Sequence, residues 1–156
     1  MVCWHFKFRV NRVTPKLRAF AERLISVGMM ETRSPASKPG VFDVIEKLRP
    51  CFSEVVGGSG FSAVLSRALT LANADVAWLR AVRVQPDGSL KGLDELEEKA
   101  DPNEIAEGRV VLLAQFVSLL VELIGERLVL QLVRQAMPKV SKEDLFFGEG
   151  SKREKN

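Results

Sequence analysis

The chain has 156 residues, of which 46% are apolar and 28% charged, and this composition is typical of a globular domain rather than a disordered chain. A chain of this length can bury a core without disulfides or metals, and one domain is expected. Its two cysteines, Cys3 and Cys51, are too few for a disulfide framework or a zinc site, which favours a reducing, cytoplasmic location.

The net charge of +3 and the isoelectric point near 9.0 come from the amino-terminal arm rather than from the body of the protein. Residues 1–33 carry seven Lys or Arg against two acidic residues, whereas residues 34–138 carry eleven against fourteen. Met29 and Met30 directly precede a linker-like stretch. A start there, with residues 1–29 as an upstream extension or a targeting segment, is an alternative interpretation of this arm.

The first predicted elements are a strand and a helix. Residues 4–10 alternate between apolar and polar side chains, which is the pattern of a half-buried strand. Thr14 followed by Pro15 is a typical helix start, and Gly28 is the expected end of that helix. The stretch 31–40 contains two prolines and a glycine among polar residues, which predicts a linker.

Three helical segments are predicted next. Residues 41–56 keep helical spacing across Pro50, which predicts a kink or a restart at the proline. Ser59 is the expected cap of a helix over residues 61–72, and a short helical piece follows at 76–79.

Residues 81–91 are predicted to form a β-hairpin with a turn at Pro86-Asp87-Gly88. Because two strands alone are only marginally stable, this hairpin is expected to lie on the helices or to pair with residues 4–10.

Two helices are predicted in the carboxy-terminal half. Asp101 and Pro102 are expected to open a helix that includes the almost wholly apolar residues 110–124. The polar residues of this helix form one stripe, which is expected to reach water, whereas those of residues 126–137 point elsewhere on the same helical wheel. A break is therefore predicted at Gly125. The stripe includes Gln115, Ser118 and Glu122.

Together these patterns predict a mainly α protein, a compact bundle of about five helices with a small β-hairpin, which an N-terminal strand can join. The predicted organisation is a basic arm at 1–30, a linker at 31–40, a helical domain at 41–138 and a polar tail at 139–156.

Side chains suited to catalysis are scarce, and no catalytic residue is assigned. His5 is the only histidine and the chain has no tyrosine, so a serine or cysteine nucleophile would lack its usual base. A small helical enzyme that uses a buried carboxylate is kept as the second alternative. Glu122 is the acid to inspect, because burial would raise the pKa of its carboxyl group, although an acid that reaches water on this stripe or pairs with an arginine is the more common outcome.

No cofactor or metal site is predicted. The glycine-rich segment 57–60 lacks the lysine and the spacing of a phosphate-binding loop. The acidic residues between positions 94 and 107 lack the ligand pattern of a calcium loop and are typical of solvated helix faces.

Nucleic-acid binding through the basic aromatic arm is the first alternative, since Lys and Arg neutralise phosphates and aromatic rings stack on bases. The body of the protein lacks a basic face in its sequence, which argues against this alternative. The residues that would carry it are Lys7, Arg9, Arg12, Lys16 and Arg18.

The leading hypothesis is a non-catalytic protein–protein interaction or regulatory module, whose partner is another protein or a second copy of the chain. It depends on the surplus of apolar helix surface and on the lack of catalytic side chains. The apolar segment 110–124 is too short to span a membrane, so no membrane insertion is expected.

Overall fold

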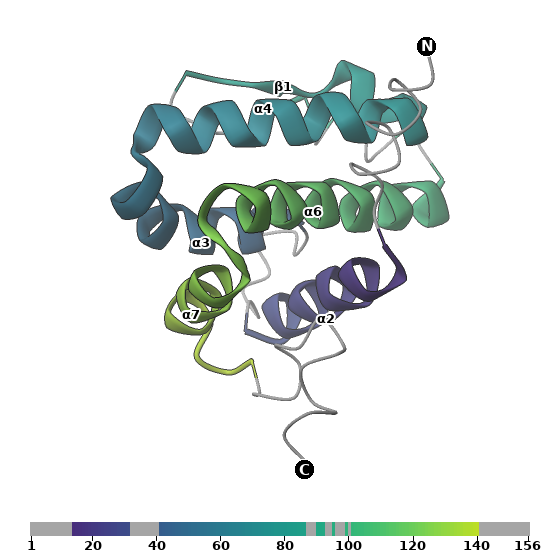
Figure 1. The fold of residues 1–156 in the computed structure, drawn as a ribbon. Helices are drawn as coiled ribbons and strands as arrows, with labels where there is room; N and C mark the ends of the chain where they lie inside the picture. The colour runs from purple at the N-terminus through teal and green to yellow at the C-terminus, as the bar shows by residue number, and fades with distance from the viewer. Residues whose placement is uncertain are drawn as a thin grey trace, which may run out of the picture.

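The fold is described by a computed structural model of the chain, which covers residues 14–31, 41–86, 90–92 and 101–140 and the single positions 95 and 99. These residues form five α-helices, one 3-10 helix and one two-stranded sheet (Figure 1), which confirms the predicted helical bundle with a small hairpin. The helices are α2 (Pro15–Glu31), α3 (Val41–Val56), α4 (Gly58–Asp75), the 3-10 helix η1 (Ala77–Ala81), α6 (Pro102–Ile124) and α7 (Glu126–Ala136). The strands are β1 (Arg83–Val84) and β2 (Leu90–Lys91).

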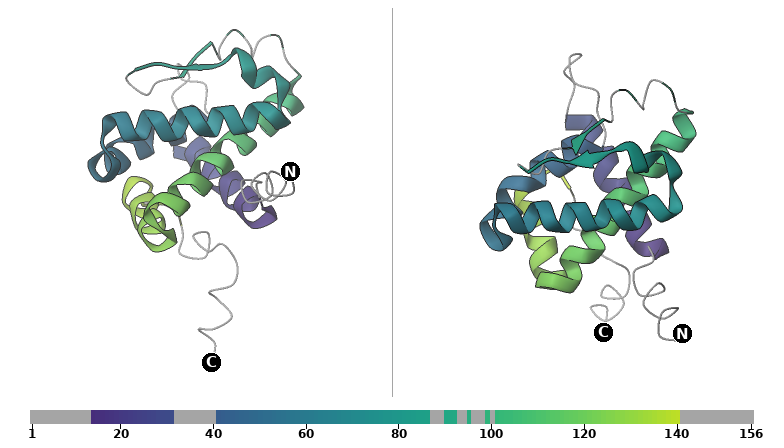
Figure 2. Two further views of the ribbon diagram at one scale, coloured as in Figure 1. Left: turned by 45° about the horizontal axis from the view of Figure 1, so that its top comes forward. Right: turned by 90° about the horizontal axis from the view of Figure 1, so that it is seen from above.

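α6 is the central helix of the bundle. α4 and α2 lie along its two sides, and α3 and α7 pack against each other and against α6 (Figure 1, Figure 2). Every residue of α6 from Val111 to Ser118 is buried, as expected for a helix that is apolar nearly all round. Phe116 meets Phe61 of α4 edge to face, with 5.3 Å between the ring centroids.

The starts of α6 and α2 are those that the sequence predicts. The Asp101 carboxylate accepts a hydrogen bond of 3.1 Å from the backbone N–H of Asn103, and Pro102 lies in the first turn. The Thr14 hydroxyl accepts one of 3.2 Å from the backbone N–H of Leu17. Both caps satisfy a backbone donor that the first turn of a helix leaves without a partner.

The break between α6 and α7 falls at Gly125, as predicted. Its backbone angles, φ 93° and ψ 151°, belong to a region that essentially only glycine occupies. The chain therefore changes direction here, and α7 contacts α3 as well as α6.

α2 continues past Gly28 to Glu31, so the predicted end of this helix is wrong. Gly28 is buried, and a Cβ atom at this position would lie 3.0 Å from Cγ2 of Val44. The glycine thus permits a close approach to α3 in the interior of α2 instead of ending the helix.

α4 begins at Gly58, and the predicted cap at Ser59 is wrong. The capping position is Gly57, whose φ of 83° is unfavourable for a residue with a side chain, and no side chain caps this helix. The preceding helix, α3, passes through Pro50 without a restart.

The hairpin forms where it was predicted. β1 pairs antiparallel with β2, with Val84 opposite Leu90, and β1 packs against α4. The Ser62 hydroxyl of α4 donates to the carbonyl oxygen of Pro86 at 3.4 Å. The hairpin therefore lies on a helix, which is one of the two arrangements expected from its marginal stability alone.

The polar stripe of α6 is buried over much of its length, which corrects the expectation that it reaches water. Gln115 is 3% exposed and Ser118 is 9% exposed, whereas Glu122 is exposed. α2 packs along this side of α6, and Leu17 of α2 lines the same surface depression as Ser118.

α2 contributes Phe20, Ala21 and Leu24 to the buried cluster that also contains residues of α3, α4, α6 and α7. All of α2 except its last residue belongs to residues 1–30, which were predicted to be an arm.

Several predicted features lie outside the described residues: the strand at 4–10, most of the linker at 31–40 and the tail beyond residue 140. Within the described part of the chain, no helix combines the length and the apolar character needed to cross a membrane.

Candidate protein interaction surface

The last turns of α6, like its first turns, reach the surface of the bundle. Leu120 is fully buried, but Leu123, one turn further along, is 59% exposed. The only other large apolar residue of the described chain with comparable exposure is Val55, at 44%. Leu123 therefore leaves apolar surface in water that an ordinary core-facing helix would bury.

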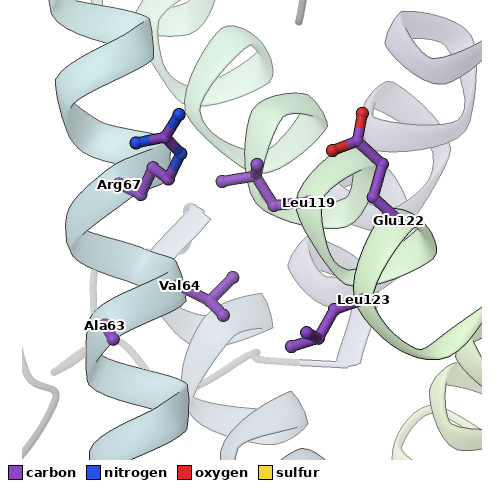
Figure 3. A pocket seen from close by; sticks show the side chains of 6 residues that line it. All are labelled: Ala63, Val64, Arg67, Leu119, Glu122 and Leu123. Carbon is purple, nitrogen blue, oxygen red and sulfur yellow. The ribbon is translucent and has the colours of Figure 1, made fainter.

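A shallow depression, here called the α4–α6 groove, lies beside Leu123 and has a volume of about 340 Å³ (Figure 3). α4 supplies one side and α6 the other. Most of its lining is apolar, and Leu119, Leu123 and Val64 project into it (Figure 3). The lining residues are Ala63, Val64, Arg67, Leu119, Glu122 and Leu123.

A second depression of about 520 Å³, the α2–α6 groove, lies on the α2 side of α6. Leu17 of α2 and Val121 of α6 are half-buried in it, and Ser118 forms part of its wall. Glu122 lines both grooves. The last turns of α6 thus form a ridge between two mainly apolar depressions.

The α4–α6 groove carries one charge of each sign. Arg67 projects from α4 and Glu122 from α6, and they stand on opposite sides of the groove with Leu119 between them (Figure 3). Both side chains are exposed. Within the described residues neither forms an ion pair or a hydrogen bond with another side chain of the protein.

Glu122 is an exposed carboxylate, so it lacks the burial on which the enzyme hypothesis depends. Burial is what would raise the pKa of a carboxyl group far enough for acid–base catalysis near neutral pH. The neighbouring residues in both grooves supply no second carboxylate and no histidine.

The five basic residues predicted for nucleic-acid contact are only partly described. Lys7, Arg9 and Arg12 lie outside the described residues. Lys16 is exposed in the first turn of α2 and lines the α2–α6 groove. Arg18 is engaged within the protein, where its guanidinium contacts two acidic side chains.

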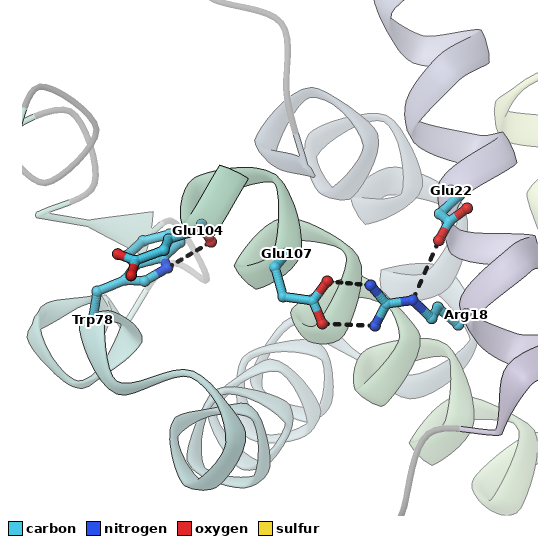
Figure 4. A network of polar contacts seen from close by, with 5 residues as sticks. All are labelled: Arg18, Glu22, Trp78, Glu104 and Glu107. Atoms are coloured by element: carbon cyan, nitrogen blue, oxygen red, sulfur yellow. Dashed lines mark hydrogen bonds and ion pairs between the residues drawn. The ribbon is translucent and has the colours of Figure 1, made fainter. Parts of the chain in front are cut away.

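The engagement of Arg18 joins α2 to α6 (Figure 4). Its two terminal nitrogens donate to the two carboxylate oxygens of Glu107, one of them at 2.7 Å, and its Nε lies 3.3 Å from Glu22. The hydrogen bonds from Arg18 lower the pKa of Glu107, and the same contact raises the pKa of Arg18. A guanidinium held in this way has fewer donors left for a phosphate.

Trp78 joins η1 to the first turns of α6 (Figure 4). Its indole Nε1 donates to the carbonyl oxygen of Glu104 at 2.9 Å. The ring lies over Gly108, where an added Cβ atom would lie 2.7 Å from Cε2. Acidic residues line a depression beside this ring, but in the described part of the chain no three His, Cys, Asp or Glu side chains lie close enough together to hold a metal ion.

Glu122 was singled out from the sequence, but the α4 side of the groove was not. The spacing of Ala63, Val64 and Arg67 places them on one side of a helix. No local signal shows that this side of α4 meets the last turns of α6, since that contact exists only in the folded bundle.

Comparison with known protein families, with curated proteins and with solved structures finds no match to this chain. Any function must therefore be argued from the residues and their arrangement.

Proposed function

We propose that this chain is a non-catalytic protein–protein interaction module, which binds its partner through the ridge formed by the last turns of α6 and through the α4–α6 groove. The observation that carries the proposal is Leu123, which is 59% exposed at the edge of a groove lined by further apolar side chains. An exposed apolar side chain beside an apolar groove, with charged groups at its border, resembles the core and rim of a protein-binding site.

The physical gain from covering this surface is substantial. Because Leu123 is 59% exposed, covering it completely would stabilise an assembly by roughly 1–2 kcal/mol, and the half-buried Leu119 and Val64 would add to that. Arg67 and Glu122 at the sides of the groove would restrict which partners can bind, because each needs an opposite charge when water is excluded.

We also propose a cytoplasmic location, as the two cysteines of the sequence suggest. Cys51 is a free, half-buried thiol, which suits a reducing compartment.

Site-specific photocrosslinking tests the interaction directly. A benzoylphenylalanine side chain at position 123 is expected to form a covalent adduct with a protein in extract from cells that express the chain. Ala74 is exposed near the other end of α4 and gives the matched control position. Mass spectrometry of the adduct identifies the partner.

An adduct at position 123 that exceeds the one at position 74 would support the proposal. Equal labelling at both positions, or no protein adduct at position 123, would contradict it. Circular dichroism of the labelled proteins confirms that both have folded.

A further inference from the structure

We propose that the surface formed by Leu123 and the α4–α6 groove packs against the same surface of a second copy of this chain, related to the first by a twofold axis that runs along the groove. This inference rests on the proposed function and names its partner. It depends on the charges at the two sides of the groove and on the position of Leu123 between α4 and α6 (Figure 3).

The charges at the two sides of the groove favour a second copy of the chain as the partner. A groove that binds an unlike protein of strong charge would be expected to carry one sign, whereas this groove carries one cation and one anion on opposite sides. A twofold axis along the groove exchanges its two sides. It therefore places Arg67 of each protomer over Glu122 of the other and forms two equivalent ion pairs.

The apolar residues favour the same arrangement. Leu123 projects from α6 toward α4, so it lies between the two sides that the axis exchanges (Figure 3). In the dimer it meets the partner's copy of the same region, and Leu119 and Val64 border that contact. One rotation thus covers the exposed leucine and pairs both charges.

The choice between the two grooves follows from their charged residues. The basic residue of the α2–α6 groove is Lys16, and this residue already interacts with another group. The α4–α6 groove is lined by two helices and contains Arg67 together with Glu122, neither of which has a side-chain partner among the described residues. The dimer is therefore assigned to the α4–α6 groove.

Charge reversal on the full chain tests this arrangement, with the dissociation constant of the dimer measured by sedimentation equilibrium. Arg67→Glu creates two repulsive contacts in each dimer, and so does Glu122→Arg, because the axis repeats every change. Each single variant is expected to weaken dimerisation by roughly tenfold or more. The double variant Arg67→Glu/Glu122→Arg restores both pairs with reversed signs and is expected to regain dimerisation to within a few-fold of the unmodified chain.

The matched control is Arg83→Glu on β1, which makes the same change in charge away from the groove and faces Lys91 across the hairpin. It is expected to leave the dissociation constant unchanged. Arg67, Glu122 and Arg83 are all exposed, so unfolding is not expected to complicate the comparison, and circular dichroism checks this.

Two results would overturn the proposal: an unmodified chain that stays monomeric up to millimolar concentration, or a double variant that dimerises as weakly as the single variants. A different result would contradict the proposed function. If the chain is monomeric but position 123 still crosslinks to a different protein, the surface binds an unlike partner. If position 123 gives no adduct at all, the interaction module itself is wrong.

Discussion

Gly108 lies directly beneath the indole ring of Trp78, and this contact leaves no room for a side chain at position 108. A glycine in a helix interior normally costs about 1 kcal/mol relative to alanine, so its presence there needs a reason. At position 108 the reason is space, because a methyl group would overlap the ring.

Gly108→Ala is therefore predicted to destabilise the fold by about 1–3 kcal/mol, since overpacking outweighs the gain in helix propensity. Urea unfolding measures the change. Gly58→Ala is the matched control, because a Cβ atom there meets nothing within 4 Å, and it is expected to be neutral or slightly stabilising. Equal effects at the two positions would contradict the assigned contact.

Gln115 is buried in the middle of α6, and its Oε1 accepts no hydrogen bond from the described residues. A buried polar atom without a partner costs about 1–3 kcal/mol, whereas an apolar side chain of similar shape does not pay this penalty.

Gln115→Met is accordingly predicted to raise the free energy of unfolding by about 1 kcal/mol. The same urea titration detects the change, with the slope of the transition as a check that the unfolded state is unaffected. A loss of stability of similar size would show instead that the amide makes an interaction on which the fold depends.

At the scale of the elements, two helix starts for which a side-chain cap was predicted differ in the structure. Asp101 caps α6 with a hydrogen bond to Asn103, whereas α4 has no side-chain cap although Ser59 stands near its start. Asp101→Ala is predicted to cost about 1 kcal/mol of unfolding free energy, and Ser59→Ala is predicted to change it by less than about 0.5 kcal/mol. Chemical denaturation of both variants tests the pair, and a larger loss from Ser59→Ala would reverse the assignment.

The ion pair between Arg18 and Glu107 makes the contact between α2 and α6 depend on pH. Folding lowers the pKa of the Glu107 carboxyl group below its ordinary value of 4.5. The ion pair therefore stabilises the fold above pH 4.5, and this stabilisation is lost as the pH falls through the lowered pKa of the folded protein. Because both side chains are partly exposed, the contribution is expected to be under about 1 kcal/mol.

Glu107→Gln is predicted to be slightly less stable than the unmodified chain at pH 7, and this difference is predicted to disappear in strong acid. Denaturation from pH 7 down to pH 2 measures it. In an Arg18→Gln background the same substitution is expected to show no such pH-dependent difference. If the difference persists in that background, Arg18 is not its cause.

The elements that could be predicted from sequence are those specified by residues close to them in the chain. The cap at Asp101, the break at Gly125 and the hairpin each depend on residues within a few positions, and all three were predicted. The continuation of α2 through Gly28 could not be, because the glycine serves a contact with Val44, which lies 16 positions away in the chain.

At the scale of the whole molecule, the difference between Leu120 and Leu123 shows what sequence leaves open. Both belong to the same apolar segment, yet one is fully buried and the other is 59% exposed. Their environments depend on where α4 and α2 lie along α6, and no pattern within α6 contains that information. The excess of apolar residues that suggested an interaction module could be seen in the sequence. The groove, and the place of Arg67 in it, could be seen only in the folded structure.

The central claim is that α6 serves the core through most of its length and binds a second copy of the chain through its last turns. Methyl NMR spectra recorded over a series of protein concentrations test it most directly. The account predicts shifts that grow with concentration at Val64, Leu119 and Leu123, while the methyl groups of Leu65 and Leu120 in the core stay unchanged. Spectra that do not vary up to millimolar concentration, or shifts centred on α7 or the hairpin, would contradict it.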